Sequence, residues 1–337
     1  MQQIAFRRLM LAAGGFLAFA TAGMAAQPLA LERATNIPGV TTSAAPPAHF
    51  DAVSATDEDL SAYGFPPRPN ATQEPAAYAR WAAAVGSQPE RLVPELLKTA
   101  VYHGPHIPTG AKTIANAATS SNWSGYTADT GAASWSSSSF STVAADFIVP
   151  AVSAQSCNGT WEYSSAWAGI DGYASSDVLQ AGVEADAMCA QGLTQTYYSP
   201  WYEWYPNAST RITNLTAAAG QTFYVHVWAT TATAGHAYVE NLNTNQSVSI
   251  NFSAPSGTKL RGESAEWVVE SPSVNGSLAT LPTYGLDYFA GATSKTLAGT
   301  PHLPGTAGSI AISLVRSGTT YSTSALLGNG GIEFTSH

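Results

Sequence analysis

The sequence predicts an all-β domain, a sandwich or barrel of short strands, that extends from residue 119 to 337. Beyond Ser120 the chain becomes rich in Ser, Thr, Gly, Tyr and Trp. Apolar and polar residues alternate there with a period of two, which is typical of half-buried strands. Turns rich in Gly, Pro and Asn separate the alternating segments, and this spacing favours a sandwich or a barrel. About 218 residues suffice for one large β domain.

Nine segments of this region have strand character, and each is expected to cross the sheet once. They are residues 140–149, 162–171, 177–184, 196–205, 222–229, 236–242, 246–252, 263–270 and 308–315. No internal repeat relates these segments.

The first 26 residues have the character of a secretory signal. Arg7 and Arg8 precede an apolar stretch from Leu9 to Met24, and small residues follow at a cleavage position. A membrane anchor is the alternative, but glycines interrupt the apolar stretch and it is short for a bilayer span. We therefore expect a secreted protein.

Residues 27–118 differ from the β region by their high content of Ala and Pro. Two helices are predicted, at 74–85 and 89–102, and Gly104-Pro105 and Pro108 end the second. A segment between a signal and a compact domain is typical of a propeptide, although an independent small helical domain is possible. As a propeptide it would be cut between about Pro108 and Asn122, because exposed linkers are where proteolysis concentrates.

Charge is scarce and uneven in this chain. Only 10% of residues are charged, and residues 119–337 hold five Lys and Arg against fourteen Asp and Glu, so the net charge of −9 arises there. So few bases exclude a nucleic-acid partner, and no later segment is suited to a membrane. With few ion pairs to lose, the domain is expected to tolerate acid.

Cys157 and Cys189 are the only cysteines, and an even number in an exported chain indicates one disulfide, with two free thiols as the alternative. The seven histidines are scattered, without HxxxH or HxH spacing. The sequence therefore predicts no metal site and no cofactor.

Four of the predicted strands carry carboxylates or an amide on one polar face, often beside an aromatic residue. These side chains are Trp167 and Asp171, Gln180 and Glu184, Glu203 and Tyr205, and Glu266. Solvated strand faces are the simpler interpretation. However, acids are concentrated here in a domain poor in charge, and solvated faces do not need large aromatics. A groove lined by these side chains is the alternative. The sequence contains no serine elbow GxSxG.

A family resemblance rests on six motifs that follow one another in order. They are SNWSGY (121–126), WAGIDG (167–172), VLQAGVE (178–184), WYEWYP (201–206), VENL (239–242) and AEWVVE (265–270). In order and spacing they resemble the glutamic peptidases, or eqolisins. The resemblance implies a sandwich of two curved antiparallel sheets, similar to the legume-lectin fold, made as a precursor with an N-terminal propeptide.

The resemblance also implies roles for individual residues. Gln180 and Glu266 match the catalytic dyad, and Glu184 stands where fungal members carry aspartate. The residues that match the family's motifs around the dyad are Trp123, Trp167, Asp171 and Glu203. Tyr205 shares a strand face with Glu203, and we expect all six of these neighbours to bind substrate.

The chemistry of the pair suits amide hydrolysis. Glu266 can activate water as a base and then protonate the leaving amine, and the Gln180 amide can donate to the oxyanion. The sequence thus predicts an acid endopeptidase that acts on proteins or peptides as a monomer, is inhibited by its propeptide and resists pepstatin. A glycosidase and a carbohydrate-binding module are the alternatives, since such sandwiches host both. A glycosidase needs two carboxylates, whereas one partner here is an amide.

Overall fold

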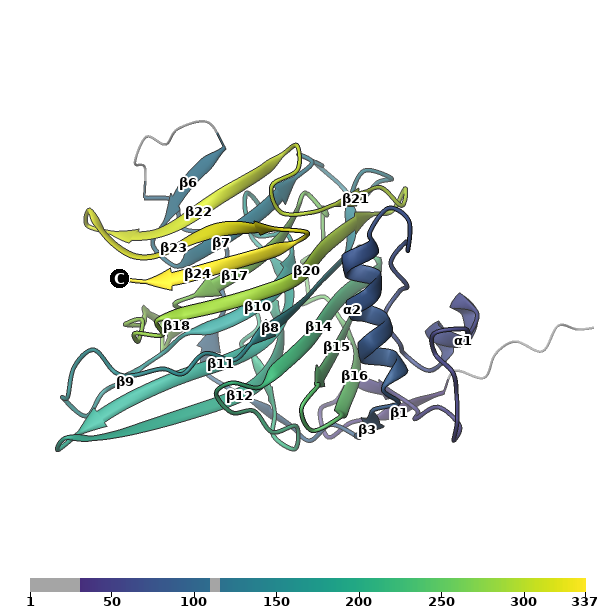
Figure 1. Ribbon diagram of the computed structural model, residues 1–337, viewed down its shortest axis with the longest axis horizontal. Coiled ribbons are helices and arrows are strands. Elements are labelled where there is room, and N and C mark those ends of the chain that lie inside the picture. Colours follow the sequence, from purple (N-terminus) through teal and green to yellow (C-terminus); the bar gives the residue numbers. More distant parts are fainter. Residues whose placement is uncertain (1–30, 110–115) are drawn as a thin grey trace, which may run out of the picture.

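The computed structural model describes residues 31–109 and 116–337. The chain forms one long antiparallel sheet that folds over on itself into two layers (Figure 1). The first layer contains, in spatial order, β12 (Leu193–Tyr205), β11 (Val178–Ala190), β10 (Ser165–Ile170), β17 (Ser264–Glu270), β7 (Trp123–Asp129) and β22 (Ser309–Arg316). All-β architecture with antiparallel pairing is therefore confirmed.

The second layer continues from β22 through the C-terminal hairpin and ends at β16. In spatial order its strands are β23 (Thr319–Gly328), β24 (Gly331–Ser336), β20 (Leu286–Thr296), β8 (Phe140–Ile148), β14 (Thr222–Thr231), β15 (Ala234–Asn241) and β16 (Gln246–Ser253). All nine predicted strands are present. β7, β20, β23 and β24 are strands that the sequence analysis did not predict.

The main hydrophobic core lies between the two layers. Leu179, Ala181 and Val183 of β11 point into it, as the alternation predicts, and β11 packs there against β14 and β15. Trp267 of β17 links the layers directly, because its indole N–H donates to the carbonyl of Ala144 in β8 at 3.0 Å. The opposite face of the first layer is therefore the outer face, and it carries the predicted polar side chains.

The segment from residue 31 to 109 does not form a core of its own. Its two helices are α1 (Asp57–Ala62), capped by Thr56, and α2 (Pro75–Gly86), which begins with a proline. Buried Trp81 and Val85 of α2 cluster with Tyr224 and Tyr238 on the outer face of the second layer. Figure 1 shows α2 lying across β14, β8 and β20. This segment therefore packs against the second layer.

The predicted helix at 89–102 is wrong. Three short strands replace it: β3 (Glu90–Arg91), β4 (Leu96–Lys98) and β5 (Val101–Tyr102). Pro94 lacks the N–H that a helix interior needs, and edge strands offer the chain other partners. β3 pairs with β16, and β4 pairs with β13 (Thr210–Ile212).

The remaining strands are short. β18 (Ser273–Val274) and β19 (Ser277–Leu278) form a separate three-stranded sheet with β5. The others belong to the long sheet: β1 (Glu32–Ala34), β2 (Thr41–Ser43), β6 (Ala117–Ser120), β9 (Trp161–Glu162) and β21 (Pro301–His302). Within residues 31–109 and 116–337, no helix has the length and apolar character to span a membrane. The predicted signal at 1–26 lies outside the described residues.

Candidate active site

Gln180 and Glu266 lie on either side of a single glycine. β10 pairs with β11 on one edge and with β17 on the other, and in both registers Gly169 is the opposite residue. Residues in register share a face of a sheet. Gln180, Gly169 and Glu266 thus form one row across three neighbouring strands. This row brings Gln180 and Glu266 together on the outer face of the first layer, with no side chain between them.

Gly169 keeps the space between the pair open. A Cβ atom there would lie 3.0 Å from Cβ of Gln180 and 2.9 Å from the Trp167 ring. Because such distances are too short for carbon atoms in contact, only glycine fits without displacing one of the two neighbours.

The Glu266 carboxyl is fully buried. Thr127, the next residue in the row, donates to Oε1 at 3.4 Å, and Oε2 has no hydrogen-bond partner among the described residues. Burial raises the pKa of Glu266 well above its usual range, and the charges of Asp171 and Glu263 add to this.

Two further rows of residues in register lie beside the row that contains Gln180 and Glu266. In the first, Trp201, Gly182, Trp167 and Val268 follow one another across the sheet, so indole rings lie on the row beside the dyad. In the second, Glu184, Ser165, Glu270 and Trp123 do the same. The Trp167 N–H donates to Glu270 Oε2 at 2.9 Å, and the rings of Trp123 and Trp167 meet edge to face at 5.0 Å.

A segment of the chain's own N-terminal region covers this face. Residues 101–107, which we call the strap, lie across the rows. The strap is held through its backbone, because the Trp123 indole N–H donates to the carbonyl of Gly104 at 3.0 Å and Asn122 Oδ1 accepts from the N–H of Ile107 at 3.0 Å. Beside the strap, a cavity of about 430 Å³ is bordered by Tyr102, Tyr205 and Ser273.

His103 of the strap contacts Gln180 and Glu203 through its backbone. Its carbonyl accepts a hydrogen bond from Gln180 Nε2, and its N–H lies 3.1 and 3.2 Å from the two carboxylate oxygens of Glu203. The remaining polar atom of the Gln180 side chain, Oε1, has no partner among the described residues. The strap thus occupies the hydrogen-bond donor of the Gln180 side chain.

A model of the Peptidase A4 family matches residues 121–335. The chain belongs to this family. Aspergillopepsin-2 of Aspergillus niger is 35% identical over 211 residues, which cover 56% of this chain and 71% of that protein. Scytalidopepsin B of Scytalidium lignicola is 36% identical over 133 residues, which cover 40% of this chain and 47% of that protein.

The solved structures agree with the family assignment. Scytalido-glutamic peptidase bound to a transition-state analogue inhibitor is 25% identical, with a TM-score of 0.54 over 64% of this chain and 98% of that one. A second structure of that enzyme, with a peptide-based analogue, is 26% identical, with a TM-score of 0.53. The resemblance read from six motifs is thus confirmed, and the chain is a glutamic peptidase, a hydrolase.

Not every predicted site residue of this peptidase faces the dyad. Asp171 instead accepts from three backbone N–H groups, those of Arg261, Gly262 and Glu263, at 2.7, 3.0 and 2.7 Å. These contacts hold the loop that leads into β17, the strand that carries Glu266. Burial raises the pKa of Asp171 to about 7, against the opposing effect of these bonds.

The other predicted residues lie around the strap. Glu203 accepts a hydrogen bond from the His103 N–H. Tyr205 lies against Gly104, and a Cβ atom added at Gly104 would be 3.5 Å from the Tyr205 ring. Glu184 is paired with Arg211 at 2.8 Å. Sequence reasoning did not count Glu270 as a site residue, and it missed His103, which lies outside the family match.

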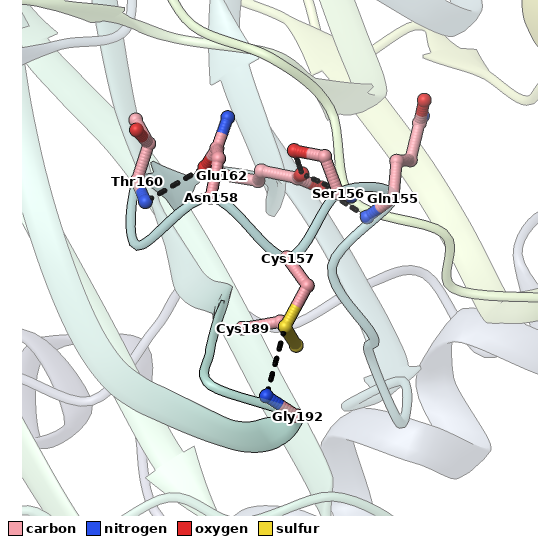
Figure 2. Close-up of a disulfide and its surroundings, with 8 residues drawn as sticks. All are labelled: Gln155, Ser156, Cys157, Asn158, Thr160, Glu162, Cys189 and Gly192. Carbon is pink, nitrogen blue, oxygen red and sulfur yellow. Dashed lines mark hydrogen bonds between the residues drawn. A yellow bond between two sulfur atoms is a disulfide. The ribbon is translucent and has the colours of Figure 1, made fainter.

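The disulfide joins Cys157 to Cys189 near the end of the long β11–β12 hairpin (Figure 2). The hairpin turn beyond it is exposed, and the N–H of Gly192 lies 3.2 Å from Sγ of Cys157. Among residues 31–109 and 116–337, no group of three His, Cys, Asp or Glu could hold a metal ion.

Proposed function

We propose that the protein is a secreted acid endopeptidase in which Glu266 and Gln180 form the catalytic dyad. The observation that carries this proposal is the row in which Gly169 separates the two side chains. Each member keeps one oxygen without a partner among the described residues, Oε2 of Glu266 and Oε1 of Gln180. A water molecule between them can be held by both oxygens, since glutamine and carboxylate oxygens accept hydrogen bonds.

The reaction follows from these positions. Ionised Glu266 takes a proton from the water while the oxygen of that water bonds to the substrate carbonyl carbon. The carbonyl oxygen becomes an oxyanion, which the Gln180 N–H₂ group stabilises. Protonated Glu266 then gives its proton to the amide nitrogen, the C–N bond breaks, and a carboxylic acid and an amine leave.

The strap supports the proposal that residues 27–118 act as an inhibitory propeptide. The His103 carbonyl uses the Gln180 donor, and the strap backbone is bound by Trp123 and Asn122. A substrate cannot reach the dyad until this segment leaves. The expected signal at 1–26 would export the precursor. Cleavage between about Pro108 and Asn122 would then release the active enzyme. We expect this enzyme to be a monomer, because one chain supplies both members of the dyad.

The test is casein digestion from pH 2 to 6 by acid-matured protein, with and without pepstatin. We expect activity that pepstatin leaves unchanged, because only one dyad member ionises. Glu266→Gln should lose about 10²–10⁴-fold in rate with its base and acid, and Gln180→Ala about 10²–10³-fold with its oxyanion donor. Gln180→Glu should lose activity wherever both acids ionise.

Circular dichroism of each variant separates chemistry from misfolding. Near-normal digestion by folded Glu266→Gln, or full inhibition of the wild type by pepstatin, would contradict the assignment. Sugar hydrolysis gained by Gln180→Glu would favour a glycosidase instead.

A further inference from the structure

The His103 side chain fills a closed pocket beside the dyad. Its ring is completely buried and stacks on the indole of Trp201, with centroids 3.7 Å apart and planes 8° from parallel. Nδ1 lies 3.3 Å from Glu270 Oε2, and Nε2 lies 3.8 Å from Glu184 Oε1. The ring is thus held flat between two carboxylates on an aromatic floor.

The backbone of His103 defines which substrate position this pocket serves. Gln180, the proposed oxyanion donor, bonds the carbonyl oxygen of His103 itself. In a substrate, the residue that supplies this carbonyl is the one immediately before the cleaved bond. The pocket that holds the His103 ring is therefore placed to receive the side chain of that residue.

The charges around the ring favour a cation. Glu184 comes from β11, Glu203 from β12 and Glu270 from β17, and Asp186 follows Glu184 on the same face of β11. Arg211 of β13 is a cation in contact with this group, and it is engaged with Glu184 Oε2 at 2.8 Å. Burial opposes a charge on His103, but Glu184, Glu270 and Glu203 outweigh it and raise the pKa of the imidazole to about 10.

We propose that Glu184, Glu270 and Trp201 form a specificity pocket for a cationic side chain, histidine above all, directly before the cleaved bond. The inference rests on the proposed function, because it takes Gln180 as the oxyanion donor. Flat cations suit the aromatic floor, so arginine should be accepted more readily than lysine.

The preference should depend on pH in a definite direction. Burial raises the pKa of both Glu203 and Glu270. The negative charge of the pocket is present above the pKa values of these carboxyls and is lost as the pH falls through them. Selection for lysine and arginine, which stay charged throughout, should therefore weaken toward pH 2, whereas cleavage after leucine should follow the dyad alone.

The experiment uses acid-matured enzyme and a set of fluorogenic peptides that differ only in the residue before one bond: His, Arg, Lys, Gln or Leu. Values of kcat/KM are measured from pH 2 to 6, and mass spectrometry identifies the cleaved bond. We expect the three cationic peptides to be cut at least about tenfold faster than the Gln and Leu peptides, an advantage typical of one charge-assisted hydrogen bond. Equal rates, or a preference for Leu, would overturn the pocket.

Glu184→Gln is the sharpest variant, because it removes a carboxylate and leaves Arg211 without its partner. It should reduce kcat/KM for the cationic peptides more than for the Leu peptide, and Glu270→Gln should do the same. Glu333→Gln on β24 lies outside the groove and serves as the matched control, with an unchanged ratio. Should the pocket variants fail to fold, the wild-type peptide series alone decides the question.

The two proposals fail in different ways. Cleavage of all peptides without regard to this residue contradicts the specificity pocket and leaves the peptidase function in place. Absence of cleavage of every peptide and of casein contradicts the proposed function, and the pocket with it.

Discussion

Gly169 is the residue on which the geometry of the proposed dyad depends, since it lies between Gln180 and Glu266 in their row. Gly169→Ala should place a methyl group 3.0 Å from Gln180 Cβ and force that side chain to move. Because a displacement of about 1 Å can cost 10²-fold in rate, we expect kcat/KM on casein peptides to fall by about that factor. The measurement is steady-state kinetics on the acid-matured variant.

Gly235 of β15 provides a matched control, because a Cβ there would lie 2.8 Å from Leu179 and 2.9 Å from Trp204, in the core. Gly235→Ala introduces similar crowding away from the dyad, so it should lower the melting temperature more than kcat/KM. If both variants lose stability and activity in the same proportion, Gly169 has no particular role in catalysis.

At this scale the sequence predicts residue identity better than residue contacts. Alternation and motifs place Gln180 and Glu266 on one outer face, and the register agrees with this. They do not show that Asp171 turns away to bind three backbone N–H groups, because that depends on a positive φ of 70° at the end of β10. His103 carries no motif at all, and its role depends on contacts made across more than 70 residues of chain.

Among the elements, the strap makes the most specific contacts with the catalytic face. A synthetic peptide with the sequence of residues 96–108 should inhibit the matured enzyme, because it retains the carbonyl bonded by Gln180 and the backbone contacts to Trp123 and Asn122. Replacing His103 by alanine in that peptide removes the Trp201 stack and both carboxylate contacts. We expect its inhibition constant to rise at least about tenfold.

Inhibition constants are measured by competition with a fluorogenic substrate at constant pH. A scrambled peptide of the same composition is the control. Equal inhibition by the native and scrambled peptides would show that the strap has no specific site on the face.

The β11–β12 hairpin carries the dyad glutamine near one end and Cys189 near the other. The Cys157–Cys189 disulfide spans 32 residues, and closing a loop of that size contributes about 3 kcal/mol to the free energy of unfolding. The double variant Cys157→Ser/Cys189→Ser should unfold at lower denaturant concentration but keep kcat/KM close to the wild type, because β10 and β12 flank the inner half of β11.

Urea denaturation of the oxidised protein and of the double variant measures this difference. Loss of activity without loss of stability would contradict it, since it would make the disulfide part of the site.

The prediction of one disulfide came from cysteine number alone, whereas the failed helix at 89–102 shows the limit of periodicity. Leu92, Leu96 and Leu97 have helical spacing, yet the edge strands β13 and β16 provide backbone partners that local sequence cannot reveal.

For the molecule as a whole, buried carboxyls determine how stability responds to pH. Burial raises the pKa of Asp146, Asp171 and Asp287 to about 7, of Asp177 to about 6 and of Glu240 to about 8. Each binds a proton in the folded state that the unfolded chain releases near pH 4. Their stabilisation is therefore complete below about pH 4 and is lost as the pH rises toward 8.

The histidines also affect how stability depends on pH, but above pH 6.5 they do not reverse the loss of stability with rising pH. His103, with a pKa raised to about 10 by its carboxylate neighbours against the effect of burial, stabilises the fold below pH 6.5 and loses this effect toward pH 10. His226 acts the other way, because burial lowers its pKa to about 3, and its contribution is lost as the pH falls from about 6.5. Between pH 6.5 and 8 the carboxyls and His103 thus act in the same direction.

We expect the precursor to melt at a higher temperature at pH 5 than at pH 8, the reverse of acid denaturation. Differential scanning calorimetry of the Glu266→Gln precursor measures this without self-digestion. A melting temperature that increases steadily from pH 5 to pH 8 would contradict the buried-carboxyl interpretation.

Because the strap precedes its binding face along the chain, the two are synthesised in a fixed order. The strap leaves the ribosome first, and Glu270, whose strand completes the face opposite it, follows roughly 170 residues later. At about 5–20 residues per second, that interval is on the order of 10–30 s. If the strap blocks the site as proposed, it is already made before the strand that carries Glu266 and Glu270, and a newly folded enzyme is covered from the start.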